Sequence, residues 1–140
     1  MTGAPRVFLD ANVLFSAALR GPVFGSILEL ADAEVIALVS SRACVAEAVT
    51  NLERKRPGSI DGLAGVLARV TLTDPDLTPH VAGAAEMVGA EDAHVLAAAM
   101  ALEAVVLLTG DTKDFGDLMN RDDLSLRVRT PRRFLIEGTL

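Results

Sequence analysis

The sequence predicts an α/β domain built on a mainly parallel central sheet. Continuous apolar runs of the kind that form buried strands occur at residues 6–9, 35–39 and 105–109, with segments of helical spacing between them. Strands that alternate with helices indicate parallel pairing. Because the runs are apolar throughout instead of alternating with polar residues, we expect helices on both faces of the sheet.

Length and composition indicate one domain over residues 1–140. The chain is 51% hydrophobic and 23% charged, which is typical of a soluble globular protein. Its one cysteine, Cys44, lies in an apolar stretch and is expected to be buried, and a chain without an internal disulfide fits a reducing cytoplasm. The longest apolar stretch, residues 95–108, is too short for a bilayer span and contains Glu103. We therefore expect a cytoplasmic protein with no membrane segment.

The remaining elements follow from periodicity and from breaking residues. Ser40-Ser41 is a helix-start signal, and Pro57-Gly58 ends the helix that it begins. Further strands are expected at residues 70–73 and, as an edge strand, at 126–129. Helices are expected at residues 13–19, 23–33, 41–53, 60–68, 79–89, 93–102, 112–119 and 131–136.

Four acidic residues stand where a ligand site would form. Asp10 closes the first strand, Asp111 follows the strand at 105–109, and Asp92 begins the helix that leads into that strand. In parallel α/β sheets ligands bind outside the carboxyl ends of the strands. Glu47 lies in mid-helix at the border of the apolar side, where a carboxylate needs a partner or a metal. Each acid also has a structural explanation: a helix cap for Asp10 and Asp92, a turn for Asp111, and a rim position for Glu47.

Carboxylates that converge without a counter-charge repel one another and raise each other's pKa. A hard divalent cation such as Mg²⁺ or Mn²⁺ relieves this repulsion and prefers oxygen ligands. Zinc is disfavoured, because the chain has two histidines and one cysteine and no cluster of them. The acids therefore favour metal-dependent phosphoryl-transfer chemistry.

Four segments, in order from about residue 7 to residue 115, resemble the motifs of the PIN domain family. They are Phe8-Leu9-Asp10-Ala11-Asn12-Val13-Leu14, the segment from Val39-Ser40 to Glu47, Asp92-Ala93-His94-Val95-Leu96-Ala97-Ala98-Ala99, and Leu108-Thr109-Gly110-Asp111-Thr112-Lys113-Asp114-Phe115. No single motif is specific to this family, but the occurrence of all four in this order in a chain of this length is a strong signal for it.

This resemblance implies a three-layer α/β/α sandwich and a Mg²⁺- or Mn²⁺-dependent ribonuclease that acts on single-stranded or structured RNA. For a small chain it also implies the toxin of a bacterial toxin–antitoxin pair of the VapC kind, a homodimer that binds a small antitoxin. The four acids would be the metal ligands and catalytic residues. Asn12 and Thr109 would orient them, and Asp114 would assist.

The formal net charge of −6 conflicts with a nucleic-acid substrate, since phosphate binding normally needs a basic surface. Metal binding at the acids would reverse the local sign of the charge. Arg20, Arg42 and Lys113 each lie close in sequence to an acidic segment. We expect these three residues to hold RNA phosphates, because cationic side chains bind phosphate directly.

Two other functions remain open. A haloacid-dehalogenase-like phosphatase also begins with a strand ending in aspartate, but it needs a second aspartate where this chain has Asn12, and a lysine for which Lys113 is poorly placed. A catalytically inactive PIN domain could bind RNA or protein without cleaving it. Intact acids at all four positions argue against that reading.

Overall fold

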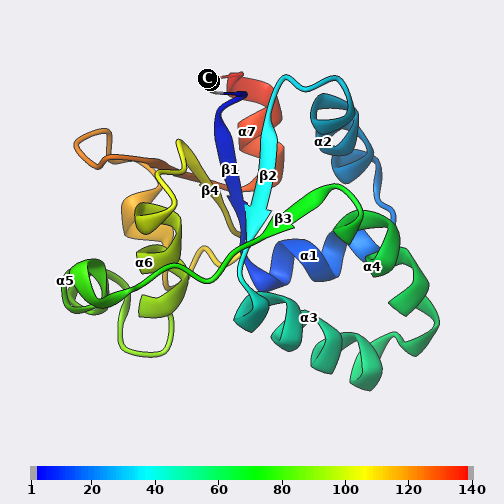
Figure 1. Ribbon diagram of the computed structural model, residues 1–140, viewed down its shortest axis with the longest axis horizontal. Coiled ribbons are helices and arrows are strands. Elements are labelled where there is room, and N and C mark those ends of the chain that lie inside the picture. The colour runs from blue at the N-terminus through cyan, green and yellow to red at the C-terminus, as the bar shows by residue number, and fades with distance from the viewer. Residues whose placement is uncertain (1–2, 139–140) are drawn as a thin grey trace.

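A five-stranded parallel sheet forms the centre of the computed structural model, which describes residues 3–138 (Figure 1). The strand order is β3-β2-β1-β4-β5, and every neighbouring pair is parallel. The strands are β1 (Arg6–Leu9), β2 (Ala37–Ser40), β3 (Val70–Leu72), β4 (Val106–Leu108) and β5 (Arg127–Arg129). The predicted edge strand at 126–129 is confirmed as β5.

The three central strands are buried, as their continuous apolar runs predict. All of Val106–Leu108 is inaccessible to solvent, and so are Val7 and Phe8 of β1. Leu9 of β1 pairs with Leu108 of β4, so the two strands end side by side. The residues that follow them, Asp10 and Thr109, therefore begin at the same edge of the sheet.

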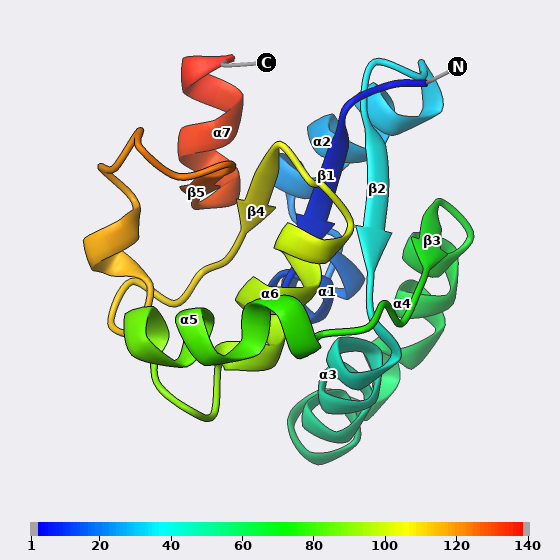
Figure 2. The ribbon, with the colours of Figure 1, turned by 60° about the vertical axis from the view of Figure 1, so that its left-hand side comes forward.

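Helices cover both faces of the sheet, which completes the predicted α/β/α sandwich (Figures 1 and 2). Helices α5 and α6 pack together on one face, and α1, α2 and α4 lie on the other. Helix α7 contacts α2 and β5. The helices are α1 (Ala11–Ala18), α2 (Pro22–Asp32), α3 (Arg42–Lys55), α4 (Ile60–Leu67), α5 (Thr78–Val88), α6 (Ala93–Ala101) and α7 (Pro131–Glu137), with 3-10 turns at Pro57–Ser59 (η1) and Gly116–Leu118 (η2).

Side-chain caps fix where three of the helices begin. Asp10 accepts the backbone N–H of Ala11 at the start of α1, and Ser41 accepts that of Cys44 at the start of α3. Thr130 does the same for α7. Each cap satisfies a backbone donor that has no partner within its helix. The Ser40-Ser41 start signal is thereby confirmed.

The predicted helix at 112–119 is wrong. The segment is a series of turns that ends in η2. One carboxylate oxygen of Asp111 accepts the backbone N–H groups of Lys113 and Asp114, at 3.0 and 2.9 Å. These bonds hold the backbone in a tight turn, as aspartate side chains commonly do. The turn directs the side chain of Asp114 back toward Asp111.

Over residues 3–138, no single helix is both long enough and apolar enough to cross a membrane. Only α1 and α2 taken together reach that length and composition, and they are bent by 102° at their junction.

Helices α1 and α4 touch at Gly62, and this contact is testable. A Cβ at Gly62 would lie 2.2 Å from the carbonyl oxygen of Ala18, whereas a Cβ at Gly65 of the same helix would meet nothing within 4 Å. We predict that Gly62→Ala lowers the free energy of unfolding by about 1–3 kcal/mol because it forces the helices apart.

Gly65→Ala is the matched control, and it should raise the free energy of unfolding by about 1 kcal/mol through helix propensity. Urea denaturation of the three proteins measures both effects. Equal stability of Gly62→Ala and the parent would contradict the close approach of α1 and α4.

Candidate metal centre

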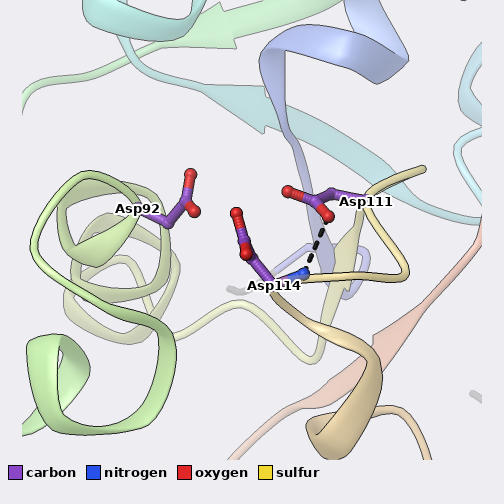
Figure 3. A group of neighbouring side chains, drawn as sticks. All are labelled: Asp92, Asp111 and Asp114. Carbon is purple, nitrogen blue, oxygen red and sulfur yellow. Dashed lines mark hydrogen bonds between the residues drawn. The ribbon is translucent and has the colours of Figure 1, made fainter.

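Three aspartates converge at the carboxyl edge of the sheet (Figure 3). Asp92 precedes α6, while Asp111 and Asp114 lie in the loop after β4. One carboxylate oxygen from each lies within 4.8 Å of the others, and Figure 3 shows the three side chains pointing toward a common space. The cluster joins residues nearly twenty positions apart, because β4 brings the loop back to the start of the helix that precedes it.

Asp10 lies beside this cluster, is 5% exposed, and is held by a hydrogen-bond network. One of its oxygens accepts the N–H of Ala11 at 2.7 Å. The other accepts the hydroxyl of Thr109 at 2.8 Å and the side-chain amide of Asn12 at 3.3 Å. The oxygen of the Asn12 amide accepts the N–H of Gly110 at 2.7 Å. Asn12 and Thr109 thus bind the end of β1 to the loop after β4.

Thr109 also places the next acid in the loop. Its hydroxyl oxygen accepts the backbone N–H of Asp111 at 3.1 Å, while its proton goes to Asp10. Asp111 in turn uses one oxygen to accept the backbone of the following turn, so its other oxygen faces the cluster (Figure 3). The orienting roles predicted for Asn12 and Thr109 fit these bonds.

Burial and the nearby acids raise the pKa values of Asp92 and Asp10. Burial is the first cause that raises the pKa of Asp92, to about 6, followed by the adjacent carboxyl of Asp114 and the charges of Asp111 and Asp10. Burial also raises the pKa of Asp10, against the lowering effect of Thr109, Ala11 and nearby His94. A cation placed among these carboxylates would oppose every one of the like-charge contributions.

Asp92 occupies the N-cap position of α6 without making a capping hydrogen bond. Its carboxylate is therefore available to a ligand, unlike that of Asp10, which does cap its helix. Asp114 is one of the three residues of the cluster, whereas the family resemblance gave it only an assisting role.

Glu47 lies outside the group of three. It is exposed on α3, not at the apolar border that its spacing indicated. Glu47 nevertheless lies close enough to this edge of the sheet to affect buried Cys44. Burial raises the pKa of the Cys44 thiol to about 11, and the negative charges of Asp10 and Glu47 both add to that increase. Glu47 thus stands on the rim of the site, with buried Cys44 near both it and Asp10.

The three cations expected to bind RNA are dispersed. Arg42 forms a 2.6 Å ion pair with Asp74 and also donates its backbone N–H to that residue. Arg20 lies at the far end of α1, beside a cavity between α2 and α4. Lys113 is exposed in the turn that Asp111 caps. Lys113 alone is part of the acidic loop.

Two residues near the site carried no sequence signal that linked them to it. Phe24 and Arg132 line an open cavity of about 570 Å³ that is also lined by Asp111 and Asn12. Phe24 belongs to α2 and Arg132 to α7. Helical spacing alone does not reveal that α2 and α7 pack together beside the carboxyl end of β4.

The residues present fit a hard divalent cation. All donors in the cluster are carboxylate oxygens, which suit Mg²⁺ and Mn²⁺. One oxygen of Asp111 and the carboxylate of Asp92 are free of capping hydrogen bonds, and a cation would offset the burial and like-charge repulsion that raise the pKa of Asp92. Asp92, Asp111 and Asp114 would hold the ion directly, with Asp10 behind them.

A sequence profile described as PIN domain matches residues 6–113 of the chain. This is more than half of the protein, and the chain belongs to the PIN domain family. A search of curated protein sequences gives no match.

Similar solved structures include three complexes from bacteria. VapBC2 of Rickettsia felis bound to a promoter DNA fragment is 19% identical, with a TM-score of 0.68 over 89% of this chain and 98% of that one. DNA-bound VapBC of Salmonella typhimurium is 16% identical, with a TM-score of 0.66 over 91% and 98%. A toxin–antitoxin complex from Klebsiella pneumoniae is 18% identical, with a TM-score of 0.62 over 89% and 97%. At these identities the likeness is one of fold, and it spans nearly the whole of each chain.

The mutual repulsion of the acids predicts a pH effect in the metal-free protein. Asp92 should titrate near pH 6, and Asp114→Asn should move its pKa down toward the ordinary 3.8, because a like charge is removed. A carboxyl whose folded-state pKa is raised loses stability as pH rises from its unfolded value to its folded one. The metal-free parent should therefore lose stability between about pH 4 and pH 6, and Asp114→Asn should lose less.

Carboxyl ¹³C NMR of Asp92 measures the pKa, and thermal melting across the pH range measures the stability. Asp61→Asn is the matched control, since it removes the same charge from an exposed site on α4. A pKa of Asp92 near 4 in the parent, or one equal in the parent and Asp114→Asn, would contradict the cluster.

Proposed function

We propose that the protein is a Mg²⁺- or Mn²⁺-dependent ribonuclease that hydrolyses phosphodiester bonds of single-stranded RNA. The observation that carries the proposal is the convergence of Asp92, Asp111 and Asp114 at the carboxyl edge of the sheet in a PIN domain. An all-carboxylate cluster fits phosphoryl transfer better than acyl or redox chemistry, because it supplies no thiol, hydroxyl or imidazole nucleophile among its donors.

Hydrolysis adds water to phosphorus and breaks one P–O ester bond. A divalent ion held by the carboxylates would supply the positive charge that stabilises the phosphate in the transition state and would make water a better nucleophile. The free carboxylate oxygens accept hydrogen bonds from water and so orient it toward phosphorus. Asn12 and Thr109 keep Asp10 and Asp111 in fixed positions, so that little reorganisation is needed during the reaction.

The contacts of Asp10 disfavour the phosphatase alternative. A phosphatase of the haloacid-dehalogenase type needs the strand-end aspartate as a free nucleophile. Both oxygens of Asp10 accept hydrogen bonds, and the carboxylate is 5% exposed. Asn12, at the position of the second acid, is committed to Asp10, Thr109 and Gly110. These contacts disfavour Asp10 as a free nucleophile.

We also propose that the protein is the toxin of a toxin–antitoxin pair, a homodimer that binds a small antitoxin. Support comes from solved VapBC and toxin–antitoxin complexes of the same fold, whose matched chains are covered almost completely. The catalytically inactive PIN domain is the second candidate, and the cleavage assay below separates it from the ribonuclease.

We predict that Asp92→Asn and Asp111→Asn abolish Mg²⁺-dependent cleavage of a mixed single-stranded RNA pool. Each removes a ligand charge with little change of shape. The loss should exceed the roughly 10–100-fold cost of removing an outer hydrogen-bond partner of a metal ligand, and Thr109→Val should fall within that range.

Asp61→Asn, with the same change of net charge on the opposite helical layer, should cleave like the parent. Thermal melting shows whether each variant is folded. Cleavage by both acid variants at the parent's rate would remove the cluster from the reaction, and a folded parent that cleaves no RNA with either metal would favour the inactive PIN domain.

A further inference from the structure

An open cavity of about 570 Å³ adjoins the acidic cluster, and elements distant in sequence build it. Asn12 and Asp111 line it from the site, α1 and α2 contribute apolar side chains, and α7 contributes its first turn. Its volume lies within the roughly 300–1,000 Å³ typical of sites for small organic ligands. A group bound there would lie next to whatever the acids hold.

Among residues 3–138, Arg132 is the only cationic residue that lines this cavity. The two nearest arginines are committed elsewhere, since Arg129 at the end of β5 and Arg133 in α7 both form ion pairs with Glu137. Arg132 is exposed and makes no ion pair or side-chain hydrogen bond within residues 3–138. Its guanidinium is therefore available to an anion that enters the cavity.

The rest of the lining suits a nucleotide. Phe24 is half-buried, while three of the other phenylalanines, Phe8, Phe115 and Phe134, are in the core. Phe24 lines the cavity beside Val23 and Ser16, and no other aromatic residue among residues 3–138 does so. An aromatic face, a hydroxyl and a free guanidinium are the groups that bind a base, a ribose and a phosphate.

We propose that this cavity is the subsite for the RNA nucleotide that adjoins the scissile phosphate. The base packs against Phe24, and the phosphate on the far side of that nucleotide pairs with Arg132. This inference rests on the proposed ribonuclease function and adds to it the residues that hold the substrate. It also accounts for RNA binding by an acidic protein. Arg132, which makes no ion pair within residues 3–138, would contact the RNA beside the acids, so that no extended basic surface is needed.

Arg132→Gln tests the phosphate contact, and Arg127→Gln is its matched control. Arg127 also makes no ion pair in the described part of the chain, but it lies at the start of β5, the opposite end of the sheet. Binding is measured by fluorescence anisotropy of a labelled single-stranded RNA, in the Asp92→Asn background with Mg²⁺, across a salt series. Arg132→Gln should weaken binding about tenfold and reduce the salt slope by roughly 0.7, and Arg127→Gln should change neither.

Phe24→Leu separates base packing from charge. It should weaken binding about tenfold without changing the salt slope, because stacking carries no counterion release. The parent protein should bind an RNA with one abasic position next to the cleaved bond less tightly than intact RNA. The Phe24→Leu variant should bind the abasic and the intact RNA with equal affinity. In the active background, Arg132→Gln should raise KM and leave kcat near that of the parent.

The outcomes of these experiments separate the proposed nucleotide subsite from the proposed ribonuclease activity on which it rests. If the parent cleaves RNA while Arg132→Gln and Arg127→Gln bind and cleave alike, the subsite is wrong and the ribonuclease stands. If Arg132→Gln loses only the binding of a co-purified protein partner, the cavity is a protein-binding site and the inference fails. If the parent cleaves no RNA, the proposed function fails and the subsite fails with it.

Discussion

The hydrogen bonds that join the ends of β1 and β4 are the constraint on which the site depends. Asp10 directly follows β1 and accepts hydrogen bonds from the hydroxyl of Thr109 and the side-chain amide of Asn12. The side-chain oxygen of Asn12 accepts a hydrogen bond from the backbone N–H of Gly110. The register of the two strands brings these groups together, since Leu9 pairs with Leu108. From this fixed point Thr109 positions Asp111, and Asp111 caps the turn that positions Asp114. Thr109 thus links Asp10 to Asp111, and Asp111 links the strand end to Asp114.

This arrangement separates two kinds of aspartate. Asp10 is buried, and both its oxygens accept hydrogen bonds, so its position is fixed whether or not it also contacts the ion. Asp92, Asp111 and Asp114 each offer a carboxylate oxygen to a common space, and burial followed by the nearby acids raises the pKa of Asp92. Repulsion of this kind lowers the stability of the empty site, and binding of a cation reverses its sign. The fold holds the acids together in spite of that repulsion because the strands beneath them are buried and paired.

Much of the fold could be predicted from the sequence, because apolar runs and helix-start signals report directly on burial and capping. The strands at 6–9 and 105–109 and the Ser41 cap are examples. The segment at 112–119 could not be, since its apolar spacing suggests a helix while the side chain of Asp111 holds the backbone in a turn.

The site was predictable in part for the same reason. Strand ends reveal Asp10 and Asp111. The place of Asp114 in the cluster depends on the turn that Asp111 caps, and Glu47 is exposed on α3. Arg132 and Phe24 lie together only through the packing of α2 on α7, a contact between segments about a hundred residues apart. Local pattern carries no information on such contacts.

The most direct test of the acidic cluster as a cation site is anomalous diffraction from crystals of the protein soaked in Mn²⁺. We expect an anomalous peak among the carboxylates of Asp92, Asp111 and Asp114, within about 2.0–2.6 Å of their oxygens as for other hard divalent ions. The peak should be lost in crystals of Asp114→Asn that retain the positions of Asp10 and Thr109. A peak only at other acidic residues, or none at millimolar Mn²⁺ in crystals whose cluster is open to solvent, would contradict the metal site.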